Sequence, residues 1–186
     1  MKLFKKLAAA ALAAVLALSM VGCGAGGTGS AFDLKNEVLN LIEDEYYMSG
    51  KTATHTTAMD AAAAKLIEKA AADEAAKNDD VTVKELLRNN GTVLQENGTG
   101  NYITIFMPYG QLSTELMQQA YIVEMKGTLE NAIRYVANDE YYNRRDTMVK
   151  IGNPEISVDD SIEIGVATGK IKGRNYLVLL VQNARA

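Results

Sequence analysis

The segment 175–182 (NYLVLLVQ) constrains the fold more than any other part of the sequence, because positions 176–181 are all apolar. A strand with one face in water alternates apolar and polar residues, whereas an unbroken apolar strand is buried on both faces. The segment 161–168 (SIEIGVAT) precedes it, and residues 169–173 (GKIKG) between them favour a hairpin. A buried hairpin after a helix-rich region predicts an α/β fold, specifically a three-layer α-β-α sandwich with a mostly antiparallel sheet.

Helical patterns occupy most of the chain before this hairpin. Ser30 and Asp33 fit the start of a helix with apolar residues at 34, 38, 41 and 42, and Gly50 marks its end. The further elements expected along the chain are an alanine-rich helix capped at Thr57 and Asp60 and reaching Ala76, a short helix from Thr82 to Leu87, a loop over 92–100, a strand over 101–107, a helix over 112–127 in which 121–123 also suit a strand, and a helix over 129–137.

The first 22 residues have the organisation of a secretory signal peptide. Three lysines precede an apolar run over 7–18, which is shorter than the roughly 20 residues that a membrane-spanning helix needs. Met20-Val21-Gly22-Cys23 resembles the lipobox of bacterial lipoproteins, in which the cysteine is acylated and becomes the new N-terminus. The resemblance implies lipid attachment at Cys23 through chains such as palmitate, and a location on the extracytoplasmic face of the cell membrane. The alternative is a simple signal peptide with a chance cysteine.

The domain organisation and the charge follow from this reading. We expect a signal peptide over 1–22, a lipidated, glycine-rich flexible tether over 23–30 and one globular domain over 31–186. Removing residues 1–22 leaves 16 basic and 23 acidic residues, a net charge of −7. An acidic head is repelled by anionic lipid and gives no electrostatic basis for binding nucleic acid.

The order of the expected elements resembles the CAP superfamily, the cysteine-rich secretory, antigen 5 and pathogenesis-related-1 (SCP-like) fold, whose bacterial members are often secreted or lipid-anchored. Five segments carry the resemblance: a first helix over 32–42, an alanine-rich helix over 60–76, a late helix at 132–136, the Ile-Gly-Val strand at 164–167 and the last strand at 176–182. The family implies the α-β-α sandwich and a cleft in which two histidines and two acids can hold a metal.

This chain departs from the family pattern at that cleft. It has a single histidine, His55, and it reads Gly100-Asn101-Tyr102-Ile103 where the family tends to show Gly-Glu-Asn-Ile. It reads Tyr141-Tyr142-Asn143-Arg144 where the family shows a histidine–arginine pair. No catalytic or metal-binding residue of the family can be carried over, so we expect no bound metal and no cofactor.

The remaining polar motifs have structural explanations that compete with functional ones. His55 lies in a polar stretch, Thr54 to Thr57, and is expected to be a solvated loop residue. The four residues Asp44–Tyr47 (DEYY) recur as Asp139–Tyr142 and are expected at the ends of two helices. They are either a rim of aromatic and acidic side chains suited to a sugar or peptide, or tyrosines that close the ends of core helices.

Adjacent charges elsewhere are expected to serve turns and helix ends. Asp79-Asp80 and Asp159-Asp160 fit turn chemistry, because neighbours along the chain do not face one bond as a glycosidase pair must. Arg144-Arg145, beside Lys150, is expected to complement the C-terminus of a helix.

The sequence therefore predicts a lipid-anchored binding module without catalytic residues. Its expected partners are the membrane, through the lipid, and cell-wall material, a lipid or another envelope protein. The alternative is a cell-envelope hydrolase with a carboxylate and tyrosine cleft, which would require Glu45, Glu140 and His55 to converge. A third possibility is an unrelated small domain with helices on only one face of its sheet.

Overall fold

The computed structural model describes residues 30–95, 100–110 and 112–184. The signal peptide, Cys23 and most of the tether lie outside these residues, so the predictions on them stay predictions. The elements are α2 (Ser30–Met48), β1 (Ala53–His55), α3 (Thr57–Ala72), the 3₁₀ turn η1 (Glu74–Lys77), α4 (Val83–Asn90), η2 (Gly91–Gln95), β2 (Tyr102–Pro108), α5 (Glu115–Arg134), α6 (Asp139–Asn143), β3 (Met148–Ile151), β4 (Ile162–Ile171) and β5 (Arg174–Asn183).

The strands form one mixed sheet in the order β1-β4-β5-β2-β3. The β4–β5, β2–β5 and β2–β3 pairs are antiparallel, and β1 runs parallel to β4. The predicted α/β class and the mostly antiparallel sheet are confirmed. The buried strand 175–182 lies at the centre of the sheet, between β4 and β2.

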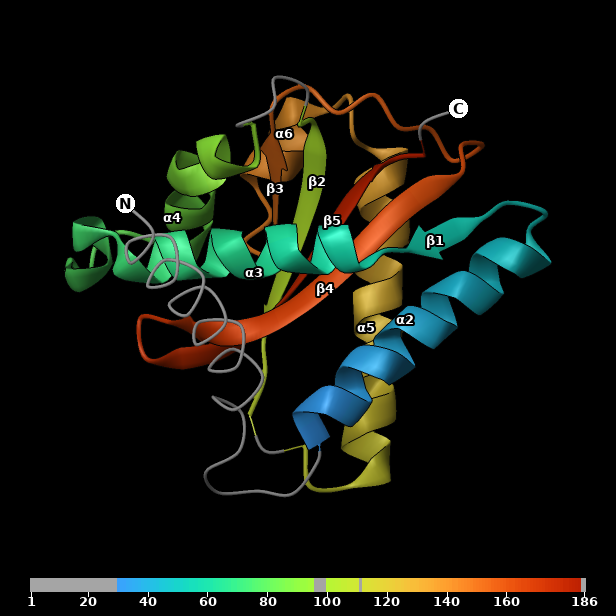
Figure 1. Ribbon diagram of the computed structural model, residues 1–186, viewed down its shortest axis with the longest axis horizontal. Helices are drawn as coiled ribbons and strands as arrows, with labels where there is room; N and C mark the ends of the chain where they lie inside the picture. Colours follow the sequence, from blue (N-terminus) through green and yellow to red (C-terminus); the bar gives the residue numbers. More distant parts are fainter. Residues whose placement is uncertain (1–29, 96–99, 111, 185–186) are drawn as a thin grey trace, which may run out of the picture.

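Helices pack on both faces of this sheet. Alternate residues of β5 separate into two apolar clusters: Leu177, Leu179 and Val181 lie with residues of α2 and α5, whereas Val178 and Leu180 lie with residues of α3 and α4. Figure 1 shows α3 crossing in front of β4 while α5 runs behind it. Burial on both sides explains why β5 carries no polar residue over 176–181.

The β4–β5 hairpin turns more tightly than the sequence suggested. Ile171 pairs with Arg174, so Lys172 and Gly173 form a two-residue turn in place of the expected loop over 169–173. Both have positive φ, 51° and 76°, as the twist-matched turn of such hairpins requires. Lys172 adopts this uncommon conformation while its Nζ donates to the carbonyls of Asn78 (2.6 Å) and Val81 (2.7 Å).

Helix boundaries differ from the predicted ones where another residue is the N-cap or where buried residues continue past the predicted end. Thr56, not Thr57, is the N-cap of α3, and its hydroxyl accepts the Met59 N–H. The helix ends at Ala72, because Asp73 starts η1. The predicted start of α4 is confirmed, with Thr82 and Glu85 in a capping box.

Helix α5 is one helix of 20 residues, so the predicted break at Gly127 is wrong. A glycine inside a helix costs only about 1 kcal/mol, and buried residues continue on both sides of it, from Tyr121 to Ile133. The short strands β1 and β3 were not predicted. None of the described helices is long and apolar enough to cross a membrane.

Candidate functional site

His55 lies on the edge strand β1, so the prediction of a solvated loop is wrong. It pairs with Ile164 of β4, and its main-chain N–H donates to the Glu43 carboxylate at 3.3 Å. Its Nε2 lies 2.9 Å from Oδ2 of Asp60, and 28% of its side chain is exposed. A strand of three residues is too short to show a periodic pattern in the sequence.

Asp60, in the first turn of α3, connects three elements. Lys35 of α2 donates to its Oδ2 at 2.6 Å, and the main-chain N–H of Val166 on β4 donates to its Oδ1 at 2.7 Å. Burial raises the pKa of Asp60, but hydrogen bonds from Lys35, Val166 and His55 outweigh it and hold the pKa below its usual range. β1 ends at His55, whose partner Ile164 lies two residues before Val166, so this carboxylate accepts a hydrogen bond where β1 no longer can. These contacts make His55 and Asp60 a structural junction between α2, α3 and β4.

The first DEYY motif belongs to the contact between α2 and α5. Glu45 forms an ion pair with Lys126 of α5 at 2.7 Å. Tyr46 packs against the core, and burial, helped by the Glu130 charge, raises its pKa to about 12. This arrangement fits the interpretation in which a tyrosine closes the end of a core helix.

The second motif does not end a helix, as was predicted, but forms the separate short helix α6. Asn138 is its N-cap. The side-chain oxygen Oδ1 of Asn138 accepts the Tyr141 N–H at 2.9 Å. Tyr142 is buried, and its hydroxyl donates to the Ala132 carbonyl at 2.8 Å. Burial raises the pKa of Tyr142 above its usual range. Tyr142 therefore anchors α6 to the end of α5.

Tyr141 remains at the surface as the middle member of a stack of planar groups. Its ring lies 4.4 Å from the ring of Tyr135, with 30° between the planes. The guanidinium carbon of Arg145 lies 4.9 Å from the centre of the Tyr141 ring. Tyr135 is 38% exposed. Arg144 is the C-cap of α6 and Arg145 follows it, so both lie at a helix C-terminus as the sequence predicted, and Arg145 also contacts an aromatic face.

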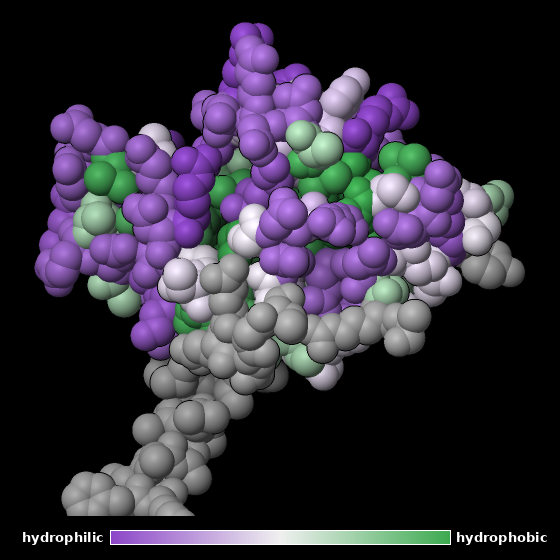
Figure 2. Space-filling view, turned by 90° about the horizontal axis from the view of Figure 1, so that it is seen from above, coloured by the Kyte–Doolittle hydropathy of each residue, from purple (hydrophilic) through white to green (hydrophobic). Residues whose placement is uncertain are grey.

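A hollow of about 340 Å³ opens beside this stack. It is lined by Asn138, Glu140, Tyr141, Arg144 and Arg145. With Tyr135 these residues form what we call the α6 surface. Arg144 and Glu140 form an exposed ion pair within it. Figure 2 looks onto this end of the molecule, where hydrophilic side chains surround smaller hydrophobic groups.

A second hollow of about 560 Å³ includes Asp139 of the same segment. Its polar lining residues are Asp139, Lys150, Asn153, Glu155, Ser157 and Asp160. Lys150 pairs with Asp139 and also lies 5.4 Å from the centre of the Tyr142 ring. The Asp160 carboxylate accepts the Ser157 N–H at 2.7 Å, which confirms its predicted turn role. Hydrogen-bonding side chains therefore continue along this end of the molecule, beyond the α6 surface.

Lys84 of α4 holds the C-terminal end of α6 in place. Its Nζ donates to the main-chain carbonyls of Tyr142, Asn143 and Arg145, and the residue is buried. Burial, with a smaller effect from the nearby Arg88, lowers the pKa of Lys84. A cation on the free carbonyls at a helix end is favourable, and here it fixes the segment that carries Arg144 and Arg145.

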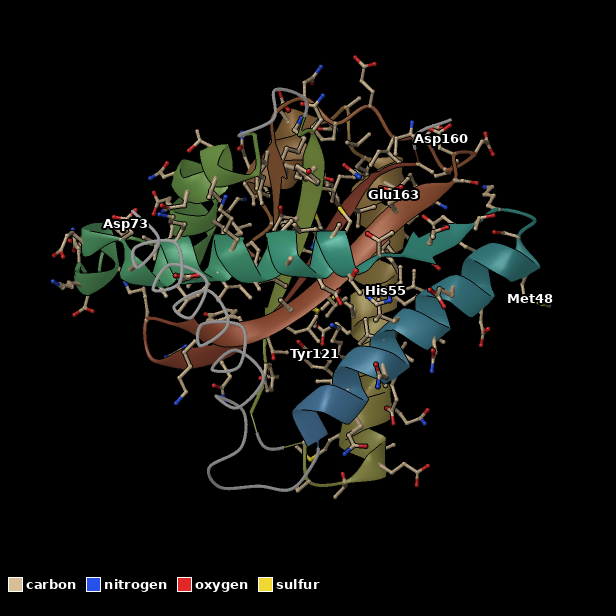
Figure 3. The ribbon with its side chains drawn as sticks, in the orientation of Figure 1. Met48, His55, Asp73, Tyr121, Asp160 and Glu163 are labelled. Carbon is tan, nitrogen blue, oxygen red and sulfur yellow. The ribbon has the colours of Figure 1, made fainter. Side chains whose placement is uncertain are left out.

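The three residues of the hydrolase alternative do not converge. Glu45 pairs with Lys126, Glu140 with Arg144 and His55 with Asp60. Figure 3 places His55 between α2 and β4, well below Asp160 at the upper end of the view. In the part of the chain that the structure describes, no group of three or more histidine, cysteine, aspartate or glutamate side chains could hold a metal ion.

The sequence did not point to two residues outside α6 that complete or support the α6 surface. Neither Tyr135 nor Lys84 stands out in the sequence, because Tyr135 falls inside the helix expected over 129–137 and Lys84 inside the short helix expected from Thr82 to Leu87. Asn138 before Asp139 and Glu140 is an N-cap signal that would have revealed the start of α6. No signal could show that Lys84 contacts residues about 60 positions later.

Comparison with known proteins gives no relative for this chain. No family model, no curated protein and no solved structure matches it.

Proposed function

We propose that this protein is a membrane-anchored lipoprotein whose domain binds a ligand of the cell envelope at the α6 surface, without catalysing a reaction. In this proposal the chain is acylated at Cys23 and lies on the extracytoplasmic face of the membrane. The domain is a divergent CAP-like, three-layer sandwich without the metal site of that family. Helices on both faces of a mostly antiparallel sheet support this fold assignment.

The stack of Arg145, Tyr141 and Tyr135 is the observation that carries the binding proposal. Exposed aromatic rings beside guanidinium groups offer apolar faces and directional donors together, which is the chemistry that sugar rings with anionic substituents require. Asn138 and Glu140 add groups that can bond to hydroxyls. Of the ligands expected from the sequence, cell-wall glycan with carboxylate or phosphate groups fits this surface best.

The proposal rests on a rigid presentation of these groups. The Tyr142 hydroxyl holds α6 on the Ala132 carbonyl of α5, and the Lys84 ammonium holds the C-terminal end of α6 through three main-chain carbonyls. A surface held in place before binding loses less entropy when a ligand arrives. Neither contact uses the side chains of Tyr135 or Arg145, so those remain for a ligand.

The test is binding of the detergent-solubilised full-length protein to purified cell-wall glycan. We expect Tyr135→Ala and Arg145→Ala each to weaken binding about tenfold. Arg174→Ala removes an exposed arginine from the distant hairpin turn and should leave the affinity unchanged. Binding should also weaken as salt is added, because a charged contact contributes to it.

Two results would contradict the proposal in different ways. Equal binding by all three variants would exclude the α6 surface as the site. Release of soluble glycan fragments by the protein would instead favour the hydrolase alternative.

A further inference from the structure

Helix α5 carries apolar side chains on its outer face as well as on its buried one. Leu116 is 80% exposed and Val123 is 63% exposed, with the exposed Ala120 between them and Met117 (47%) alongside. Positions 116, 120 and 123 lie on one face of a helix, because they are four and seven residues apart. We call these four residues the α5 ridge.

The α5 ridge is separate from the face of α5 that packs into the core. Tyr121, Ile122 and Met125 form the buried face of the same helix and pack with α2 and the sheet. A helix at the surface of a soluble domain normally presents polar residues outward. Apolar residues gathered on an outer face indicate a contact with something outside the domain.

The position of the ridge suggests what that contact is. Helices α2 and α5 pack against each other, and both begin at the lower end of the molecule in the view of Figure 1. Cys23 lies seven residues before Ser30, the first residue of α2. Seven fully extended residues span at most about 25 Å, so an acyl chain at Cys23 would hold this end of the molecule close to the bilayer.

We infer that the α5 ridge docks on the lipid bilayer, with its side chains in the interfacial region. This inference rests on the lipid anchor of the proposed function and adds a defined orientation to it. The anchor keeps the bilayer at a high effective concentration, so a small apolar contact is sufficient for docking.

A second copy of the chain is a poorer occupant of this surface. A stable protein interface buries about 800 Å² and some 20–30 residues on each side, and four side chains on two turns of one helix provide much less. The acids flanking the ridge, Glu115 and Glu124, are exposed and disfavour an anionic surface. We therefore expect docking on uncharged lipid such as phosphatidylcholine.

The test uses the full-length, lipidated protein reconstituted in phosphatidylcholine vesicles that contain a lipid spin-labelled on its acyl chain. A fluorophore is attached to a cysteine introduced by Gln119→Cys, at an exposed position beside the ridge. A second preparation carries it through Glu68→Cys on α3. We expect the spin label to quench the fluorophore at position 119 and not the one at position 68.

Substitutions in the ridge then show whether its side chains cause the contact. In the Gln119→Cys background, Leu116→Ser with Val123→Ser should reduce quenching about threefold or more. Met48→Ser is the matched control, because Met48 is 82% exposed but lies at the other end of α2, as Figure 3 shows. It should leave the quenching unchanged.

The outcomes separate this inference from the proposal beneath it. If the protein stays with the membrane but position 119 is not quenched, the docking surface is wrong and the anchor stands. If neither the wild-type protein nor the Cys23→Ser variant fractionates with membranes, the proposed lipid anchor is wrong. Cross-linking of position 119 between two copies, without quenching, would assign the ridge to a second copy and overturn the inference.

Discussion

Gly165 lies where the first turn of α3 meets β4, and a Cβ atom there would lie 2.2 Å from the main-chain carbon of Met59. Since that neighbour is backbone, α3 would have to move away from the sheet. We expect Gly165→Ala to lower the free energy of unfolding by about 3 kcal/mol, measured by chemical denaturation. This contact also explains the glycine of the Ile-Gly-Val segment in physical terms.

The control for that substitution is Gly127→Ala. Gly127 lies inside α5, and a Cβ atom there meets no atom of the described residues within 4 Å. The same change should therefore raise the free energy of unfolding by about 0.5–1 kcal/mol through helix propensity alone. Equal effects of the two substitutions would show that α3 does not press on β4.

Thr104 is fully buried in β2, and its hydroxyl has no hydrogen-bond partner among the residues that the structure describes. It pairs across the sheet with Val149 and Leu180, which belong to the cluster beneath α3 and α4. We expect Thr104→Val to raise the free energy of unfolding by about 1 kcal/mol, because it removes an unsatisfied polar atom without changing the shape. Thr82→Val should instead lower it by about 1 kcal/mol, since that hydroxyl caps α4. A loss of stability in Thr104→Val would mean that the hydroxyl has a partner.

The elements most visible in the sequence were those with a strong cap or a long apolar pattern. The Thr82 capping box and the apolar run of β5 both gave correct elements. β1 and β3 were missed because they have three and four residues, too few for a pattern. Gly127 does not end α5, because the buried residues that continue past it outweigh a local helix breaker. Local signals decide where elements start, but packing decides whether they continue.

The junction of α2, α3 and β4 gives a pH prediction. Asp60 has a pKa below its usual range in the folded state, so its contribution to stability is complete above the ordinary pKa of about 3.9. That contribution is lost as the pH falls through the lower folded-state value, because the unfolded chain binds the proton first. Denaturation of Asp60→Asn across the acid range should therefore show a flatter loss of stability than wild type. If the free energy of unfolding of Asp60→Asn falls in acid as steeply as that of wild type, other carboxylates control this loss of stability.

At the level of the whole molecule, the sequence predicted which strand is buried on both faces but not where a ligand would bind. An unbroken apolar strand is normally buried on both faces, so β5 could be placed between two layers of side chains. The α6 surface depends on Tyr135 and Tyr141 meeting across a turn, and on Lys84 reaching from α4. Such long-range contacts follow from the topology, and a single sequence does not contain them in readable form.

The arrangement of the two ends of the molecule leads to a last prediction. Helix α5 has 20 residues and spans about 30 Å, and it runs from the end where α2 begins to the end that carries α6. A ligand surface at α6 thus faces away from a bilayer that contacts the start of α5. We expect vesicle-anchored protein and a soluble Cys23→Ser form to bind cell-wall glycan with affinities within about twofold of each other, because the bilayer neither covers the site nor contributes to it. Binding to both forms can be measured by co-sedimentation with insoluble glycan. A markedly weaker affinity of the anchored form would mean that the site faces the membrane, and it would contradict this orientation even if the α6 surface binds the ligand.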